Sequence, residues 1–301
     1  MSIKPVASRR YSIKGVVFEA ESLQPGLHVT ATPIGHLGDI SLRAVNALAA
    51  ADEILCEDTR VTGKLLHRYG ITNRLVPYHD HNAAKLRPAI LEALKAGKAL
   101  VLVSDAGTPL VSDPGYKLAR AVIEAGLPLH VIPGASAPLA ALTLSGLPSD
   151  RFMFCGFLPE KKNERRRLLQ SLKAVPATLI FFESARRITA ALADIAETLG
   201  PRTVAVTREL TKLYEEAVRG EAAEVATLLT ERETIKGEIT LVVSPPGEEA
   251  PPAQEVIDQA LLEASVTMPA GKAAADIAHR FGLAKRDLYA RLLALKDKKT
   301  Q

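Results

Sequence analysis

The chain has 301 residues, a length more typical of two domains than of one. Its 38 Lys and Arg against 34 Asp and Glu give a net charge of +4, which permits a polyanionic partner without requiring one. Two cysteines, Cys56 and Cys155, argue against a disulfide scaffold and a CxxC metal site, and they suit a reducing compartment. We therefore expect a cytoplasmic protein. No apolar run approaches the roughly 20 residues of a membrane span.

Residues 1–25 are basic at the start and carry no apolar core of a secretory signal, so we expect a flexible N-terminal leader there. From Leu27 to Gly134, short apolar runs alternate with helical patterns. The predicted strands are 27–32, 54–56, 75–76, 99–103 and 129–132. The first predicted helix begins after an N-cap at Asp39 or Ser41. The other predicted helices are 61–69, 82–96 and 116–125. This alternation predicts a parallel sheet covered by helices on both faces.

A junction at 146–150 is followed by a second set of apolar strands, at 152–154, 178–182, 203–207 and 239–243. Residues 214–219 alternate and are interpreted as an antiparallel strand. A linker rich in Pro, Gly and Glu (244–252) precedes helices at 254–265, 270–281 and 284–296. These last helices fit either a helix-turn-helix or a plain helical hairpin. The expected domains are 26–147, 148–245 and 246–301.

Three loops of Gly, Pro and small polar residues follow predicted strands, at 33–39, 105–115 and 133–136. Ligands of open parallel sheets bind beyond the carboxyl ends of the strands, and glycine lets the backbone approach them closely. None of the loops has the G-x-G-x-x-G or P-loop pattern, which argues against NAD and ATP. Loops of this kind can also be plain turns, so position alone does not establish a ligand site.

The loops occur together as Thr32-Pro33-Ile34-Gly35-His36-Leu37-Gly38-Asp39, Ser104-Asp105-Ala106-Gly107-Thr108-Pro109 and Ile132-Pro133-Gly134-Ala135-Ser136-Ala137. In this order they resemble the first domain of the tetrapyrrole-methylase superfamily. Further motifs resemble its branch of small-subunit rRNA cytidine 2′-O-methyltransferases. They are Glu57-Asp58-Thr59-Arg60, Tyr78-His79-Asp80-His81-Asn82, Phe181-Phe182-Glu183-Ser184, Arg208-Glu209-Leu210-Thr211-Lys212 and Gly237-Glu238-Ile239. The resemblance runs from about Leu27 to Val243.

The resemblance implies an α/β fold: two α/β/α domains of the tetrapyrrole-methylase type with a cofactor cleft between them, plus a small C-terminal helical domain. It implies S-adenosylmethionine as the cofactor and no metal. Carried over by position, the cofactor-binding residues are Pro33, Gly35, Asp105, Ala106, Gly107, Thr108, Val111, Ser136, Ala137, Leu210 and Glu238. Glu183 is expected to contribute to the cofactor site from the second domain.

Transfer of a methyl group to a ribose hydroxyl requires near-attack geometry and is helped by a base. The candidate catalytic residues are Asp58, His79, Glu183, Glu209 and Lys212. Each has a structural alternative. Asp58 can simply cap a helix, His79 can be a hydrogen-bonded surface residue, and the other three can form internal ion pairs. Asp105 can equally order the loop that follows it.

The candidate RNA-binding residues are Arg60 and the cluster Lys161, Lys162, Arg165, Arg166 and Arg167. A solvated helix face is the alternative for that cluster. The expected partner is small-subunit (16S) rRNA or the small ribosomal subunit, with no membrane, and the resemblance implies a homodimer. Two other functions stay open: a tetrapyrrole C-methylase, and a non-catalytic RNA-binding factor of ribosome assembly. Affinity for S-adenosylmethionine would separate the last of these from an enzyme.

Overall fold

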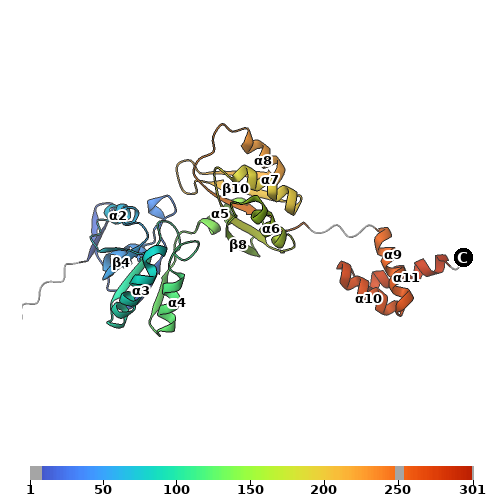
Figure 1. Ribbon diagram of the computed structural model, residues 1–301, viewed down its shortest axis with the longest axis horizontal. Helices are drawn as coiled ribbons and strands as arrows, with labels where there is room; N and C mark the ends of the chain where they lie inside the picture. The colour runs from blue at the N-terminus through green and yellow to red at the C-terminus, as the bar shows by residue number, and fades with distance from the viewer. Residues whose placement is uncertain (1–8, 248–253, 300–301) are drawn as a thin grey trace, which may run out of the picture. The chain divides into compact units, whose positions relative to one another are not determined.

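Two five-stranded sheets form the frame of residues 1–245 in the computed structural model, which describes residues 9–247 and 254–299 (Figure 1). The first sheet has the order β5-β4-β6-β3-β7, and its strands are all parallel. Its strands are β3 (Gly26–Thr30), β4 (Glu53–Cys56), β5 (Leu75–Pro77), β6 (Ala99–Val103) and β7 (Leu129–Ile132). The sheet confirms the parallel arrangement that the alternating pattern predicted.

Helices cover both faces of this sheet because its central strands are apolar on both sides. Val101 and Val103 pack against helices on one face, and Leu100 and Leu102 pack against helices on the other. Figure 1 shows α2 and α3 on opposite sides of β4. The helices are α1 (Leu42–Ala50) and α2 (Thr59–Arg68) on the first face, and α3 (Asp80–Lys95) and α4 (Tyr116–Glu124) on the second. A short 3₁₀ helix, η1 (Leu37–Asp39), precedes α1.

The second sheet is mixed and has the order β11-β10-β12-β9-β8. Only β8 and β9 are parallel neighbours, and β10 pairs antiparallel with both β11 and β12. The strands are β8 (Phe152–Phe157), β9 (Thr178–Ser184), β10 (Thr203–Arg208), β11 (Glu216–Glu221) and β12 (Glu238–Val243). The antiparallel strand expected at 214–219 is therefore confirmed, starting two residues later. Helices α6 (Lys162–Leu172), α7 (Ile188–Leu199) and α8 (Ala222–Thr230) cover one face.

Helix α5 (Ala137–Ser145) covers the opposite face of this second sheet. Its residues Ala141 and Leu142 are buried against Ile180 of β9 and Val242 of β12. The helix follows β7 of the first sheet directly, and it lies inside the range expected for the first domain. By packing, the second lobe therefore begins at α5 and not at residue 148.

Residues 10–19, expected as part of a flexible leader, form an antiparallel hairpin of β1 (Arg10–Ile13) and β2 (Val16–Glu19). The prediction of a flexible segment is wrong here. The segment contains apolar side chains, which a flexible leader would expose to solvent and which the hairpin partly buries. Tyr11 stacks on Phe18 across the pair, and Tyr11 and Ile13 pack against the core beneath α1 and α2. The Ser12 N–H also donates to the Tyr69 carbonyl at 2.6 Å. Residues 1–8 of the expected leader lie outside the described residues.

The second unit, residues 246–301, is a helical domain with a core of its own. It contains α9 (Gln254–Thr267), α10 (Ala270–Phe281) and α11 (Lys285–Lys299), and Leu261, Ile277 and Leu292 are buried among them. Helix α10 ends at Gly282, whose φ of 66° is the left-handed conformation that favours glycine. Across the described helices, none has the length and apolarity needed to cross a membrane.

Candidate functional site

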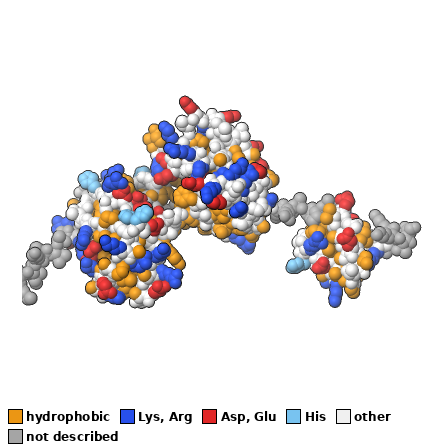
Figure 2. Space-filling view, viewed as in Figure 1, with side chains coloured by type: hydrophobic (Ala, Val, Ile, Leu, Met, Phe, Trp, Pro, Cys, Tyr) orange, Lys and Arg blue, Asp and Glu red, His pale blue; other side chains and the backbone are white. Residues whose placement is uncertain are grey.

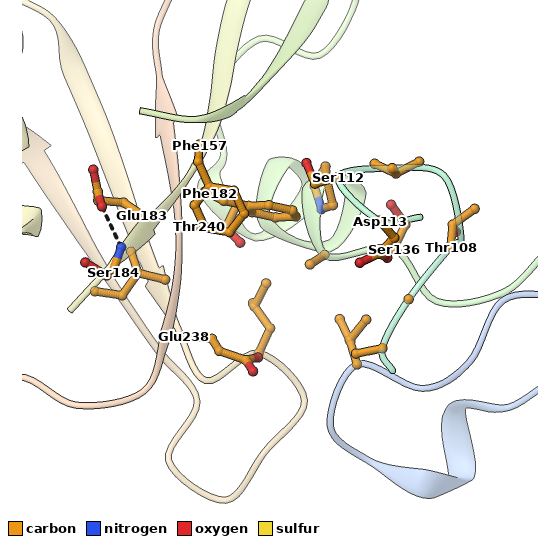
Figure 3. Close-up of a pocket in the computed structure, with 18 of the residues that line it drawn as sticks. Thr108, Ser112, Asp113, Ser136, Phe157, Phe182, Glu183, Ser184, Glu238 and Thr240 are labelled. Atoms are coloured by element: carbon orange, nitrogen blue, oxygen red, sulfur yellow. Dashed lines mark hydrogen bonds between the residues drawn. The ribbon is translucent and has the colours of Figure 1, made fainter. Parts of the chain in front are cut away.

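A cavity of about 410 Å³ lies between the two lobes of the first unit (Figure 3). Its volume falls within the roughly 300–1,000 Å³ that is typical of small-molecule sites. The first lobe and the start of α5 contribute Ile34, Ala106, Gly107, Thr108, Val111, Ser112, Asp113, Ser136, Ala137 and Pro138. The second lobe contributes Phe157, Phe182, Glu183, Ser184, Ala185, Leu210, Gly237, Glu238, Ile239 and Thr240. Nine of the residues expected here line the cavity, including Glu183.

The first-lobe wall is preformed because its three loops are bonded to one another. Thr32 and Gly107 exchange two backbone hydrogen bonds, of 2.8 and 3.0 Å, and the Thr108 hydroxyl donates to the Ala135 carbonyl at 3.2 Å. Gly107 has a φ of 79°, and a Cβ there would lie 3.3 Å from Ile34 Cγ2. Ser112 also has a positive φ, of 64°, which is a strained conformation for a non-glycine residue. Such strain at a cavity wall is typical of a ligand site.

The second-lobe wall is set by the alternation of side chains along β9 and β12. Phe182 and Thr240 are register partners on the face that carries α5, and both line the cavity (Figure 3). Glu183 is the next residue, so its side chain turns to the opposite face. Its carboxylate is 0% exposed and accepts from Arg187 Nε at 2.7 Å and from the Ser184 N–H at 2.7 Å. These contacts correspond to the ion-pair alternative for Glu183, and a catalytic role for this residue stays a prediction.

Glu209 and Lys212 form an ionic network at the edge of the cavity. Glu209 Oε1 accepts from Lys212 Nζ and from the Glu238 N–H, both at 2.9 Å, and Lys212 Nζ lies 3.1 Å from Glu238 Oε2. The hydrogen bond from Lys212 holds the pKa of Glu209 below its usual range. Glu238 lines the cavity, whereas Glu209 and Lys212 do not. Glu209 and Lys212 therefore lie in the loop that carries Leu210, away from the cavity wall.

Gly35 brings the two lobes into contact. A Cβ at this position would lie 2.6 Å from Lys212 Cγ and 2.7 Å from Thr211 Oγ1, so only glycine fits without a shift. The His36 N–H donates to Thr211 Oγ1 at 3.0 Å. Neither Pro33 nor Gly35 lines the cavity, and their neighbour Ile34 does. Gly35 thus joins the two lobes, and ligand contact by Pro33 and Gly35 stays a prediction.

Asp58, His79 and Asp105 meet in a separate hollow, together with Glu57 and Arg60. Asp105 Oδ1 accepts from the Asp58 N–H at 3.0 Å, so Asp105 holds the β4–α2 loop and does not line the cavity. Asp58 caps α2 by accepting from the Arg60 N–H at 2.8 Å. The hydrogen bonds from Arg60 lower the pKa of Asp58 to about 2. A carboxylate with that pKa is a poor base at neutral pH.

His79 begins α3, where its backbone N–H is bonded to the Asn82 side chain at 2.9 Å. Its ring nitrogen Nδ1 is buried and has no hydrogen-bond partner among the described residues. His79 lies in the separate hollow with Asp58 and Asp105, apart from the cavity lining. His79 is thus close to two other candidates but does not face the cavity.

Asp113 lines the cavity and was not among the candidate residues. Burial, together with the carboxylates of Glu57 and Asp105, raises its pKa to about 6, against a hydrogen bond from Ser104. A carboxyl group with a pKa close to the working pH, at the wall of a cavity, fits the requirements of a general base. Asp113 lies in the glycine-proline loop at 105–115, where no local pattern indicated that it would be buried.

The basic cluster at the start of α6 is largely neutralised by α7. Arg165 is 5% exposed, and its Nη2 lies 2.6 Å from Asp194 Oδ2. Arg166 pairs with Asp194 at 2.7 Å and with Glu197. Lys161 pairs with Glu164 at 3.1 Å. Arg165 is therefore already buried and paired, which argues against the expected RNA contact, whereas Lys162 and Arg167 remain exposed.

The cavity suits a nucleoside-sized ligand with an apolar or weakly polar body. Small side chains such as Ala106, Ser136 and Ala137 leave room beside the backbone, and the glycine-rich loop allows close approach. S-adenosylmethionine meets these conditions. Within residues 9–247 and 254–299, no group of three or more His, Cys, Asp and Glu side chains is arranged to hold a metal ion.

Comparisons with known proteins agree with this geometry. Residues 26–226 match the family described as Tetrapyrrole (Corrin/Porphyrin) Methylases, and residues 249–296 match the RsmI C-terminal HTH domain. That second match favours the helix-turn-helix interpretation over the plain hairpin.

Relatives with the name ribosomal RNA small subunit methyltransferase I include proteins from Mesorhizobium japonicum and Erythrobacter litoralis. The protein from Mesorhizobium japonicum is 52% identical over 92% of this chain and 95% of its own length. The protein from Erythrobacter litoralis is 51% identical over 92% and 98%. Among solved structures, the uroporphyrin-III C-methyltransferase of Thermus thermophilus with S-adenosyl homocysteine has a TM-score of 0.50 at 19% identity. It covers 72% of this chain and 96% of its own, which shows the shared fold.

Proposed function

The chain belongs to the family of ribosomal RNA small subunit methyltransferase I, and from this premise we propose that it methylates 16S rRNA. The reaction is transfer of a methyl group from S-adenosylmethionine to the ribose 2′-hydroxyl of a cytidine. The observation that carries the proposal is the cavity between the lobes, whose walls are built from the loops that the family motifs supply. The substrate is 16S rRNA, either free or within the small ribosomal subunit.

Residues of both lobes would hold the cofactor. Ala106, Gly107, Thr108 and Val111 would contact it from the β6–α4 loop, and Ser136 and Ala137 from the start of α5. Leu210 and Glu238 would close the other side. When bound, S-adenosylmethionine supplies an activated methyl group on a sulfonium sulfur. The protein's contribution is to fix the direction of attack and to exclude water by the apolar side chains of Ile34 and Phe182.

The proton of the ribose hydroxyl needs an acceptor, and Asp113 is the residue proposed for it. Asp113 lines the cavity, and with a pKa of about 6 it is mostly ionised at neutral pH. The hydroxyl hydrogen would pass to its carboxylate as the oxygen forms its bond to the methyl carbon. Glu183 and Glu209 serve other roles, because both are already engaged in ion pairs.

The setting of the activity follows from the same proposal. Cys56 and Cys155 are both free, which suits a reducing cytoplasm. A homodimer is proposed as the working form. Exposed apolar side chains on α4 and β7, namely Tyr116, Ile123 and Val131, offer a candidate surface for it. Sedimentation of the purified chain measures this directly.

The decisive experiment incubates the protein with S-adenosylmethionine labelled in the methyl group and small ribosomal subunits from cells lacking this gene. Mass spectrometry of the digested rRNA should locate the label on a cytidine ribose. Label on a base, or no label on RNA, would contradict the proposal. Transfer to a tetrapyrrole in parallel reactions would favour the C-methylase alternative. Absence of any affinity for S-adenosylmethionine in calorimetry would favour a non-catalytic assembly factor.

A further inference from the structure

Helix α2 carries a row of cations along one side. Arg60, Lys64 and Arg68 are spaced four residues apart, which places them on one face of the helix, and all three are exposed. The opposite side is buried through Leu65 and Leu66. At a rise of about 1.5 Å per residue, the row extends over about 12 Å. One strand of a nucleic-acid helix carries a phosphate about every 3.4 Å, so the row can span several phosphates.

Two of the three cations of this row, Lys64 and Arg68, are not neutralised by the protein as those of α6 are. Helix α2 contains no Asp or Glu. In the part of the chain that the structure describes, no ion pair joins Lys64 or Arg68 to a carboxylate, and Arg60 pairs only with Asp58. Figure 2 shows Lys, Arg and His side chains gathered at the surface over α2. Lys64 and Arg68 therefore keep their attraction for a polyanion.

Both ends of α2 adjoin the inter-lobe region. At its start, Asp58 is bonded to Asp105, the residue before Ala106 of the cavity wall. At its end, Arg68 lines a groove of about 670 Å³. The groove also contains Lys14, at the tip of the β1–β2 hairpin, and His36. No Asp or Glu occurs among the described residues that line the groove.

The hairpin adds a cation that lies outside the residues matching the methylase family. The match begins at residue 26, whereas Lys14 occupies the hairpin turn with a φ of 49°. This conformation, followed by Gly15 with a φ of 85°, turns the chain tightly between β1 and β2. Lys14 has no ion-pair partner among residues 9–247 and 254–299. The row on α2 therefore continues into the groove.

We infer that Arg60, Lys64, Arg68 and Lys14 bind the phosphate backbone of the RNA strand that presents its ribose to the cavity. The inference rests on the proposed function, because it assumes an RNA substrate at the cavity. The α2 row, and not the basic start of α6, is then the main source of sequence-independent affinity. Contacts of this kind position the strand without reading its bases.

The test compares two double variants of the full-length protein. Lys64→Gln/Arg68→Gln removes two charges from α2. Lys85→Gln/Lys117→Gln removes two exposed charges from α3 and α4, on the opposite face of the same sheet. Filter binding to deproteinised 16S rRNA and to small subunits, without cofactor, is measured over a range of KCl concentrations. Calorimetry with S-adenosylmethionine checks that both variants retain a formed cavity.

The α2 variant should bind deproteinised rRNA about tenfold more weakly at low salt. Its log–log salt slope should be shallower than that of the wild type by about 1.4, because each lost contact to single-stranded RNA removes about 0.7. The α3–α4 variant should bind like the wild type, and both should retain wild-type affinity for S-adenosylmethionine. At saturating subunits, kcat of the α2 variant should be unchanged while KM rises.

Equal slopes for the wild type and the α2 variant would overturn the inference. So would a loss confined to assembled subunits, which would indicate an acidic ribosomal protein as the partner. Failure of this inference and failure of the proposed function can be told apart. If the wild type transfers no methyl group to RNA, the proposed function fails, and the binding slopes still decide whether α2 contacts RNA.

Discussion

His36 of the first lobe donates its backbone N–H to Thr211 Oγ1 of the second lobe at 3.0 Å. The two residues belong to loops that meet at Gly35, beside the cavity proposed to hold S-adenosylmethionine. The contact fixes the distance between the cavity walls at one end. Thr211 adopts a φ of 63°, a strained conformation that persists only where its surroundings impose it.

Replacing Gly35 by Ala should weaken cofactor binding. The new Cβ would lie 2.9 Å from the Leu210 carbonyl oxygen as well as against Lys212 and Thr211, so the loops must separate. We expect a loss of about 1–3 kcal/mol in the free energy of unfolding, as is usual for overpacking. Affinity for S-adenosylmethionine, measured by calorimetry, should fall about tenfold.

Gly63→Ala provides the matched control. Gly63 lies inside α2, and a Cβ there would come no closer than 4.0 Å to Leu75 Cδ1. Alanine should therefore stabilise the helix, by roughly 0.5–1 kcal/mol, with no effect on cofactor affinity. Unchanged cofactor affinity in Gly35→Ala would show that the inter-lobe contact does not set the width of the cavity.

Asp113→Asn should lower kcat by about 10²–10⁴-fold if Asp113 accepts the proton. The wild-type rate should fall as the pH drops below about 6, since the carboxylate must be ionised to act as a base. The variant should lose this acidic limb, and its affinity for S-adenosylmethionine should stay near that of the wild type. If the variant still lost activity below about pH 6, the titrating group would be a residue other than Asp113.

The same substitution should raise stability at neutral pH. The folded state raises the pKa of Asp113 from 3.8 to about 6, so folding disfavours the ionised form. The folded protein therefore gains stability from protonation of Asp113 as the pH falls through this range, and loses it as the pH rises. Asn carries no charge to bury. The Tm of the variant should exceed that of the wild type above about pH 6, and the difference should shrink towards pH 4.

Glu183→Gln should affect stability and not the chemical step. Glu183 lines the cavity, but its carboxylate is buried and pairs with Arg187 at 2.6 Å. Loss of the charged hydrogen bonds should cost about 1–3 kcal/mol in urea unfolding. At a temperature where the variant is folded, kcat should stay within about twofold of the wild type. A decrease in kcat of about 10²-fold or more would indicate that Glu183 takes part in the reaction.

Arg165→Gln and Arg167→Gln separate structure from recognition on α6. Arg165 is buried and holds Asp194, so its loss should destabilise the protein by about 3 kcal/mol. Arg167 is exposed, and its replacement should change stability by less than about 0.5 kcal/mol. Once folded, the Arg165 variant should bind 16S rRNA as tightly as the wild type. Weaker binding by the folded variant would restore Arg165 as an RNA contact.

The strands and their terminal loops could be predicted because apolar runs and glycine-proline turns are local features. Ala106, Gly107 and Ser136 were placed correctly at the cavity for this reason. The direction of the Glu183 side chain could not be predicted, because it depends on which face of the second sheet α5 covers. Phe182 and Thr240 were missed for the same reason.

The burial of Arg165 did have a signal in the sequence. Arg165 precedes Leu169 by four residues and Leu172 by seven, and all three are buried on one side of α6. The run of three arginines obscured this periodicity. Asp113 had no comparable signal, since its raised pKa comes from burial and from Glu57 and Asp105, which are distant in sequence.

The packing of α5 determines where the chain can be divided into fragments that fold. A fragment that starts at residue 148 would leave Ile180, Ala205 and Val242 facing solvent, because the helix that shields them would stay attached to the other half. A fragment that starts near residue 136 keeps that helix with its sheet. Domain exchange between relatives should therefore place its crossover ahead of α5, although this joint falls inside the ligand-lining loop.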